Sequence, residues 1–335
     1  MSELSTPFCL LDLLRAHCNL PTHSGSVAGL DEEAAGEAPS GGDASGPAMV
    51  WEADSEDVDA LASVSRAISA MGPPKSAFWR ARILESSTRS WDRFYHSHNA
   101  GFFLPRTYLS RDFPCLQRAA TQPLSLLEFG CGTGASLLPL LSALPHLHAT
   151  GFDLSPHAIA LAAAHPVATG LGAGRCLFFA GDATDPGCTV AQQVARAQAQ
   201  AQHPPAPLFD AVLLLFCLSA IAPELHTAVL QRASQCLRAG GLLLLRDYGA
   251  GDEAQARFGR GAKLDEEGTV MVRRDGTLAA FLDLQLVRRH AAASGLEETP
   301  GGGSHYLRRL YSNRATGQRL RRVFVHGVFR KPMLL

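Results

Sequence analysis

No stretch of 18 consecutive apolar residues occurs in this chain of 335 residues, so the sequence predicts no membrane-spanning helix. The eight cysteines form no C-x-x-C pair, and none lies near a histidine at zinc spacing. Neither a zinc site nor a disulfide framework is therefore indicated. The start of the chain carries Glu3 and Asp12 with a single arginine, Arg15, which is unlike a signal or transit peptide. We expect a soluble cytoplasmic protein, with the nucleus as the alternative, that has no membrane partner and binds no metal.

The formal net charge of −1 hides a strong asymmetry along the chain. Residues 1–60 contain twelve Asp and Glu residues but one basic residue. Residues 246–335 contain sixteen Lys and Arg residues against ten acidic ones. Two arginine clusters in this part, at 308–309 and 319–322, would attract phosphates, and a solvated charged surface is the alternative.

Three regions of the chain differ in composition. Residues 27–49 have almost no large apolar side chains, so they cannot bury enough surface to offset the entropy of ordering. We therefore expect residues 1–75 to be an acidic, largely disordered extension with short helices. Residues 76–123 interleave aromatic side chains with arginines, which either pack on a following sheet or stack on nucleic acid bases. Residues 124–335 are expected to form the main domain.

A glycine-rich turn follows the first strongly apolar segment of the main domain. Residues 124–129 predict a buried strand, and residues 135–144 predict a helix. Between them lie three alternate glycines, Gly130, Gly132 and Gly134, which let the backbone turn tightly against a ligand. Dinucleotide dehydrogenases place a third glycine differently, so the spacing favours an S-adenosylmethionine (SAM) pocket. A turn with a packing role only is the alternative.

Two acidic residues flank this turn in the predicted sheet. Asp153 ends a second strand predicted over 148–152, where a carboxylate can bind both ribose hydroxyls of a nucleoside. Glu128 lies in the first apolar strand and needs a cationic or hydrogen-bonding partner there. The methionine ammonium of SAM would be such a partner, and nearby backbone amides are the alternative.

Apolar runs and turn residues continue the alternation of strands and helices. The remaining strands of this pattern are predicted at 176–180, 212–218 and 242–245, followed by a hairpin around Asp275–Gly276, a helix at 283–294 and a closing strand at 322–330. We therefore expect an α/β fold, a Rossmann-like class I methyltransferase with a doubly wound, mostly parallel sheet and antiparallel edge strands.

Polar residues that follow predicted strands are further site candidates. Asp182 follows the third strand and can accept the adenine amino group, with a helix cap as the alternative. Arg246, Asp247 and Tyr248 follow the fifth strand and are expected at the ligand rim of the sheet. An ion pair at the end of the strand is the alternative interpretation.

At these residues the chain resembles the methyltransferase-like family that forms N3-methylcytidine in tRNA. The resemblance spans about residues 76–332 and rests on the glycine motif and on four further elements: W-D-R-F-Y at 91–95, L-S-A-I at 218–221, R-D-Y-G at 246–249 and R-R-D-G-T at 273–277. The chain departs from the family pattern at Leu104–Pro105, where a basic and an acidic residue usually precede Arg106.

The resemblance implies a role for individual residues. It implies that Trp91 and Tyr95 close over the cofactor. It implies that Gly130 and Asp153 hold the methionine and ribose parts and that Asp182, Ala183 and Leu215 frame the adenine. It also implies that the RNA or the target base is contacted by Arg106, Arg246, Lys263 and Arg273.

The expected function is a SAM-dependent tRNA methyltransferase that forms N3-methylcytidine in the anticodon loop, with position 32 as the usual target of the family. Cytosine N3 carries a lone pair, so positioning suffices without a strong base, and Asp247 would stabilise the cationic product ring. The expected partners are tRNA and a helper such as an aminoacyl-tRNA synthetase. The alternatives are a methyltransferase of proteins or small molecules and a non-catalytic SAM-binding scaffold subunit.

Overall fold

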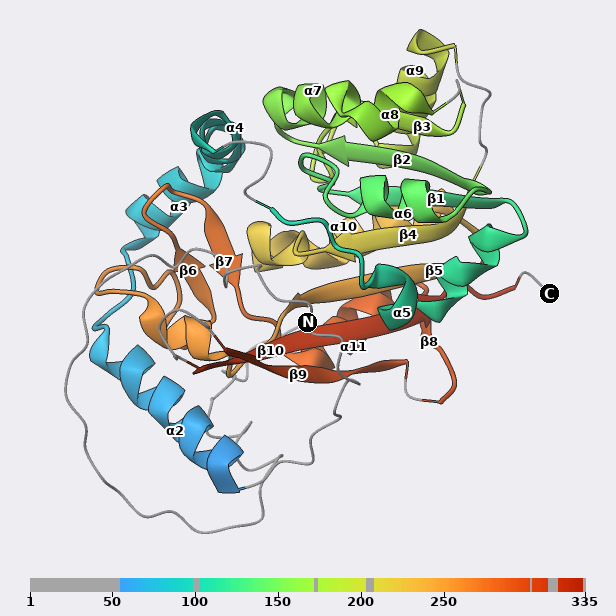
Figure 1. Ribbon diagram of the computed structural model, residues 1–335. Helices are drawn as coiled ribbons and strands as arrows, with labels where there is room; N and C mark the ends of the chain where they lie inside the picture. Colours follow the sequence, from blue (N-terminus) through green and yellow to red (C-terminus); the bar gives the residue numbers. More distant parts are fainter. Residues whose placement is uncertain are drawn as a thin grey trace.

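The computed structural model describes residues 55–98, 103–171, 174–202, 208–301, 303–312 and 319–333 (Figure 1). The expectations for residues 1–54 lie outside these ranges. Among the helices described, none is long and apolar enough to cross a membrane.

The centre of the fold is a mostly parallel sheet with strand order β3-β2-β1-β4-β5-β10-β8. The parallel strands are β1 (Leu124–Phe129), β2 (Leu147–Asp153), β3 (Cys176–Ala180), β4 (Phe209–Leu215) and β5 (Leu237–Tyr248). The antiparallel additions are β8 (Glu297–Glu298), β9 (Ser304–Ser312) and β10 (Arg319–Arg330), with β9 and β5 both paired to β10. The predicted doubly wound sheet with antiparallel edge strands is confirmed.

Helices cover both faces of this sheet because its central strands are apolar on both sides. In β4, Val212 and Leu214 face one core, whereas Leu213 faces the other, as the period of two requires. The first face packs against α9 (Val190–Gln200), α10 (His226–Cys236) and α11 (Leu284–Ala293). The second packs against α5 (Leu109–Asp112), η1 (Pro114–Ala120), α6 (Leu137–Ala143), α7 (Pro156–Ala164) and α8 (Pro166–Gly170).

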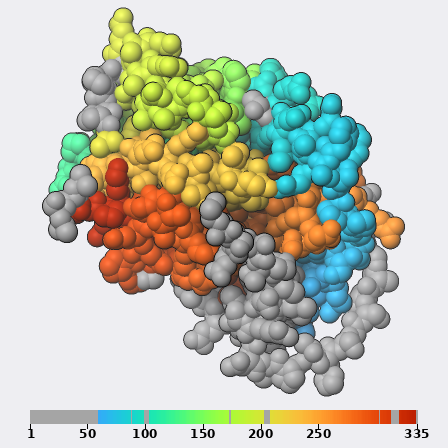
Figure 2. Space-filling model, turned by 180° about the vertical axis from the view of Figure 1, so that it is seen from behind, coloured from blue at the N-terminus to red at the C-terminus, as the bar shows by residue number. Residues whose placement is uncertain are grey.

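A smaller unit lies beside the carboxyl ends of the parallel strands (Figure 1). Its elements are α2 (Ser55–Ala70), α3 (Ala77–Glu85), α4 (Ser87–Ser97), η4 (Glu253–Arg257), β6 (Val270–Val272) and β7 (Leu278–Ala280). Val64 and Ile68 of α2 pack with Met271 and Phe281, so segments 200 residues apart share one core. Figure 2 shows the same neighbourhood from behind, with blue and cyan helices against the orange segment.

Several predicted strand boundaries were wrong, and the ends of β4 and β5 each have a backbone reason. Strand β5 continues through Tyr248 instead of ending at 245, because β10 supplies hydrogen-bonding partners along its edge. Strand β4 ends at Leu215 instead of 218, because Phe216 has φ +53 and a 3-10 turn follows at Leu218–Ala220 (η2). A second 3-10 turn, η3 (Pro223–Leu225), then leads into α10. Strand β9 was not predicted.

Candidate cofactor and substrate site

The three glycines after β1 adopt the left-handed conformation that glycine tolerates best. Their φ angles are +66 at Gly130, +54 at Gly132 and +84 at Gly134. A Cβ atom on Gly132 would lie 2.5 Å from the hydroxyl oxygen of Tyr95, and one on Gly134 would lie 2.8 Å from Leu138 Cδ1. The turn therefore requires glycine both for its conformation and for its space.

Asp153 ties the end of β2 to this turn. Its Oδ2 accepts a hydrogen bond of 2.9 Å from the Gly132 amide, and its Oδ1 accepts one of 2.9 Å from the Ser155 amide. Burial raises the pKa of Asp153 to about 6, although these two amides oppose the shift. A carboxylate oxygen can accept two hydrogen bonds, so each Asp153 oxygen can still accept one from a ligand hydroxyl.

Glu128 is the most unusual group beside the turn. Its side chain is fully buried, and neither carboxylate oxygen has a hydrogen-bond partner among the residues that the structure describes. Burial raises the pKa of Glu128 to about 7, while Ser136 and the Arg106 guanidinium nearby work against this shift. The alternative of a carboxylate that caps backbone amides is therefore wrong. An unpaired buried carboxylate is costly, and it fits a ligand that brings an ammonium group.

The aromatic residues of α4 form one wall next to the glycines. Trp91, Phe94, Tyr95 and Phe103 pack with Ala158 of α7. The ring centroids of Trp91 and Tyr95 are 6.2 Å apart, and those of Tyr95 and Phe103 are 6.0 Å apart. Trp91 and Tyr95 thus lie where a bound cofactor would pass, and their closure over it stays a prediction.

The three residues expected around the adenine lie at the ends of β3 and β4. Asp182 Oδ1 accepts hydrogen bonds of 2.6 Å from both the amide and the hydroxyl of Thr184, so it shapes its own loop. The helix-cap alternative for Asp182 is wrong, because Thr189 caps α9. Ala183 and Leu215 are buried. Their contact with adenine stays a prediction.

Arg246 lies inside β5 and is 3% exposed, whereas the sequence predicts it just beyond the strand, at the ligand rim of the sheet. Its guanidinium is 2.5 Å from Asp112 Oδ2 and lies over the rings of Tyr108, at 4.8 Å, and Phe324, at 4.7 Å. The alternative interpretation, an ion pair at the end of the strand, agrees with this contact between Arg246 and Asp112. Arg246 therefore holds α5 against β5, and its role toward a substrate stays a prediction.

Asp247 and Tyr248 complete the strand. Asp247 is 1% exposed. Its Oδ2 accepts a hydrogen bond of 3.0 Å from the Ser219 amide, and its Oδ1 accepts one of 2.8 Å from the Tyr248 amide. Burial raises the pKa of Asp247 to about 6, against the hydrogen bonds from Ser219. Tyr248 is half-buried, and its ring centroid lies 5.1 Å from that of Phe216.

The three residues other than Arg246 that are expected to face RNA lie in different parts of the fold. Arg106 lies beside the glycine turn, where it donates a hydrogen bond of 3.1 Å to Ser136 Oγ. Arg273 donates to the Leu278 carbonyl at 2.6 Å and braces the turn between β6 and β7. Lys263 is 5% exposed and forms a backbone bridge to Met271. Arg273 and Lys263 therefore belong to the smaller unit.

Phe216 is a site residue that the sequence interpretation missed. Its left-handed φ of +53 is rare for an aromatic residue, and its amide donates a hydrogen bond of 2.9 Å to the Arg246 carbonyl. The Arg106 guanidinium lies 5.2 Å from its ring centroid. Only the spatial position of the turn after β4 reveals this residue, since the sequence shows an ordinary apolar run.

Comparisons with known proteins agree with this geometry. A family model described as a methyltransferase domain matches residues 105–296. The chain is 34% identical to tRNA N(3)-cytidine methyltransferase METTL6 of Mus musculus, over 77% of the chain and 85% of that protein. It is 34% identical to tRNA N(3)-methylcytidine methyltransferase Mettl2 of Drosophila melanogaster, over 76% of the chain and 74% of that protein. It is 30% identical to tRNA N(3)-methylcytidine methyltransferase trm141 of Schizosaccharomyces pombe, over 76% of the chain and 97% of that protein.

Proposed function

The chain belongs to the tRNA N(3)-cytidine methyltransferase family, and from this we propose that it methylates N3 of a cytidine in the anticodon loop of tRNA, at position 32. The structural observation that supports SAM as the methyl donor is Glu128, a buried carboxylate without a partner among the described residues, beside a turn of three left-handed glycines. The chemistry of this donor set fits SAM, with Glu128 for its ammonium group and Asp153 for its ribose hydroxyls.

The residues around the turn have to position the target base. When bound, SAM supplies a methyl group on a positively charged sulfur. Cytosine N3 has an in-plane lone pair, so the chain needs no strong base and acts by alignment. Tyr248 and Phe216 offer ring surfaces for an extruded base, and Asp247 offers a negative charge for the ring as it becomes cationic.

We further propose a division of labour along the chain. Residues 1–75 would be an acidic extension, residues 76–123 would cover the cofactor and RNA site, and residues 124–335 would be the catalytic domain. We propose the cytosol as the compartment and a tRNA-binding helper, such as an aminoacyl-tRNA synthetase, as a second partner. Among the described residues no group of three or more His, Cys, Asp or Glu is placed to hold a metal ion.

Nucleoside mass spectrometry tests the proposed function. Purified protein is incubated with bulk tRNA and isotopically labelled SAM, and the tRNA is then digested. We expect labelled 3-methylcytidine. If tRNA stays unlabelled while proteins or small molecules of an added cell extract take up the label, the first alternative function is correct. If nothing is labelled although SAM binds, the assay is repeated with purified synthetases to test for the helper.

The raised pKa of Glu128 predicts that SAM binding depends on pH. Protonation of Glu128 below pH 7 removes the negative charge that pairs with the ammonium group, so affinity should fall as the pH decreases from 7.5 to 5.5. The loss should approach about tenfold per pH unit. The folding stability of the ligand-free protein should depend on pH in the opposite direction. The raised pKa of Glu128 contributes stability that is present at low pH and is lost as the pH rises through 7.

Titration calorimetry measures the SAM affinity of the wild type and of Glu128→Gln between pH 7.5 and 5.5. Glu128→Gln should bind SAM about 10–100-fold more weakly at pH 7.5, since a charged hydrogen bond is lost, and its affinity should vary less with pH. Asp153 titrates in both proteins, so the difference between the two curves reports Glu128 alone. Identical pH dependence in both proteins would contradict the assignment.

A further inference from the structure

Strands β9 and β10 extend past the main sheet at its carboxyl edge. Residues 324–330 of β10 pair with β5, whereas residues 319–323 pair with β9 and not with β5. Because β10 is antiparallel to β5, this extension begins where the carboxyl ends of β1, β4 and β5 lie. Five residues span about 16 Å in a strand. We call residues 308–312 and 319–323 the arm.

The arm is rich in positive charge and contains no acidic residue. Two of its arginines have carboxylate partners: Arg322 Nε lies 2.8 Å from Asp252 Oδ2 and Arg321 Nη1 lies 3.6 Å from Glu253 Oε1. The remaining three, Arg308, Arg309 and Arg319, form no side-chain hydrogen bond or ion pair with any residue that the structure describes. Within the described part of the chain, no carboxylate therefore neutralises these three guanidinium groups.

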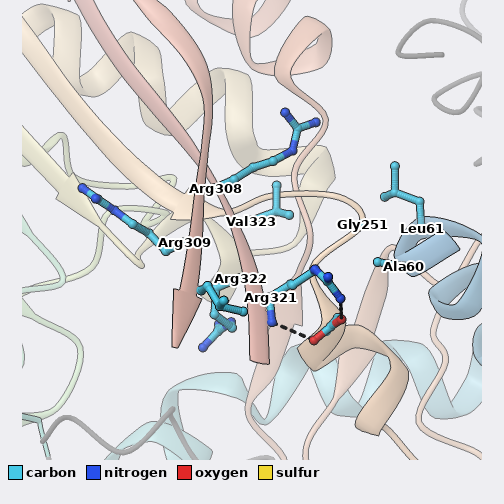
Figure 3. A pocket seen from close by; sticks show the side chains of 10 residues that line it. Ala60, Leu61, Gly251, Arg308, Arg309, Arg321, Arg322 and Val323 are labelled. Atoms are coloured by element: carbon cyan, nitrogen blue, oxygen red, sulfur yellow. Dashed lines mark hydrogen bonds and ion pairs between the residues drawn. The ribbon is translucent and has the colours of Figure 1, made fainter. Parts of the chain in front are cut away.

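The side chains of Arg308 and Arg309 lie on opposite sides of the arm. Figure 3 shows Arg308 and Arg309 pointing to opposite sides of β9, with Arg321 held by Glu253. Arg308 lines a pocket together with Leu61 of α2 and Val323 of β10. Arg309 lies directly opposite Arg322 in the strand register, and Asp252 is the counter-ion of Arg322 only.

The arm is continuous with the candidate substrate site. The Arg322 guanidinium lies 5.3 Å from the ring centroid of Tyr248 and 5.2 Å from that of Phe324. The guanidinium of Arg246, on β5, also lies over the Phe324 ring. An RNA whose target base reaches Tyr248 therefore has its neighbouring phosphates within the reach of the arm.

We propose that the arm binds the phosphate backbone of the RNA substrate next to the target nucleotide, through Arg308, Arg309 and Arg319. This inference rests on the proposed function, because it assumes that the substrate is RNA. Guanidinium groups bind phosphate through paired hydrogen bonds, and the absence of acidic residues from the arm leaves these charges uncompensated. The test also has to distinguish a competing hypothesis, in which the acidic segment 1–54 is the ligand of the arm; α2, which follows that segment in the sequence, lines the same pocket.

A charge-matched pair of variants tests the arm. The test variant is R308A/R309A/R319A. The control is R196A/R289A/R330A, which removes three exposed arginines that also have no partner among the described residues and that lie outside the arm. We expect the test variant to raise the Kd for tRNA at least tenfold at 150 mM salt, relative to the control. Its slope of log affinity against log salt should fall by about two to three, at roughly 0.7–0.9 per phosphate contact.

Two further measurements separate the possible failures. The Kd for SAM should be unchanged in both variants, and the single substitution Arg319→Glu should also weaken tRNA binding, so a folding defect cannot imitate the result. Equal tRNA affinity in test and control overturns the arm as a phosphate site. Tighter tRNA binding by the test variant also overturns it and identifies residues 1–54 as the occupant. A wild-type protein that binds and methylates no tRNA would refute the proposed function itself.

Discussion

Replacing Gly132 by alanine should lower the affinity for SAM at least 100-fold while the protein still folds. The new Cβ would lie 2.5 Å from the Tyr95 hydroxyl oxygen, and φ at this position is +54. A left-handed residue with a Cβ costs about 1–2 kcal/mol, and the clash displaces Tyr95 or the turn in addition. The Gly132 amide that donates to Asp153 Oδ2 would move with the turn. One substitution therefore disturbs both the proposed wall and the proposed ribose ligand.

Titration calorimetry with SAM and a thermal melt measure this effect. Gly72→Ala is the matched control, because Gly72 has a similar φ of +81 but nothing within 4 Å of its added Cβ. The control carries the backbone strain without the clash, so it should bind SAM normally. A Gly132→Ala variant with wild-type SAM affinity would show that the ligand lies elsewhere.

Replacing Asp247 by asparagine should lower kcat about 100–1000-fold and leave the Kd for SAM within threefold. The substitution removes the negative charge that we assign to stabilising the cationic product ring, and losses of about 3–4 kcal/mol are usual for such groups. Asparagine also cannot accept from both the Ser219 and Tyr248 amides, so about 1–3 kcal/mol of stability should be lost as well. The thermal melt separates that loss from the catalytic one.

The pH profile of kcat distinguishes a charge role from a merely structural one. The pKa of Asp247 is raised to about 6, so its carboxylate is present above pH 6 and is lost as the pH falls. Wild-type kcat should decrease about tenfold per pH unit below 6, whereas Asp247→Asn should show no such decrease. Asp283→Asn is the control, since Asp283 caps α11 through the Leu286 amide. Methylation by Asp247→Asn at the wild-type rate would remove Asp247 from the mechanism.

Local patterns predicted the frame of the site. The apolar run before Gly130 and the acidic residue after the next run place β1 and β2 correctly, and Cys176–Ala180 matches the predicted third strand residue for residue. These features depend on side-chain periodicity and on glycine conformation, which act over a few neighbouring residues. The family elements beyond them identified the reaction.

Long-range contacts decided what the candidate residues do. Arg246 is held by Asp112, which is 134 residues away along the chain, and it is buried inside β5, whereas the sequence predicts it beyond the end of the strand. Asp252 and Glu253 form ion pairs with two arginines of the arm. These ion pairs distinguish the two arginines from the other three, which have no partner among the described residues.

The sequence by itself determined the fold class, the cofactor turn and the family, because short-range periodicity and motif spacing do not depend on distant partners. Tertiary structure alone decided that Glu128 has no hydrogen-bond partner among the described residues and that Phe216 adopts a left-handed turn beside Arg106. It also decided which arginines are neutralised. Burial and charge pairing depend on which segments meet in space, and no local pattern contains that information.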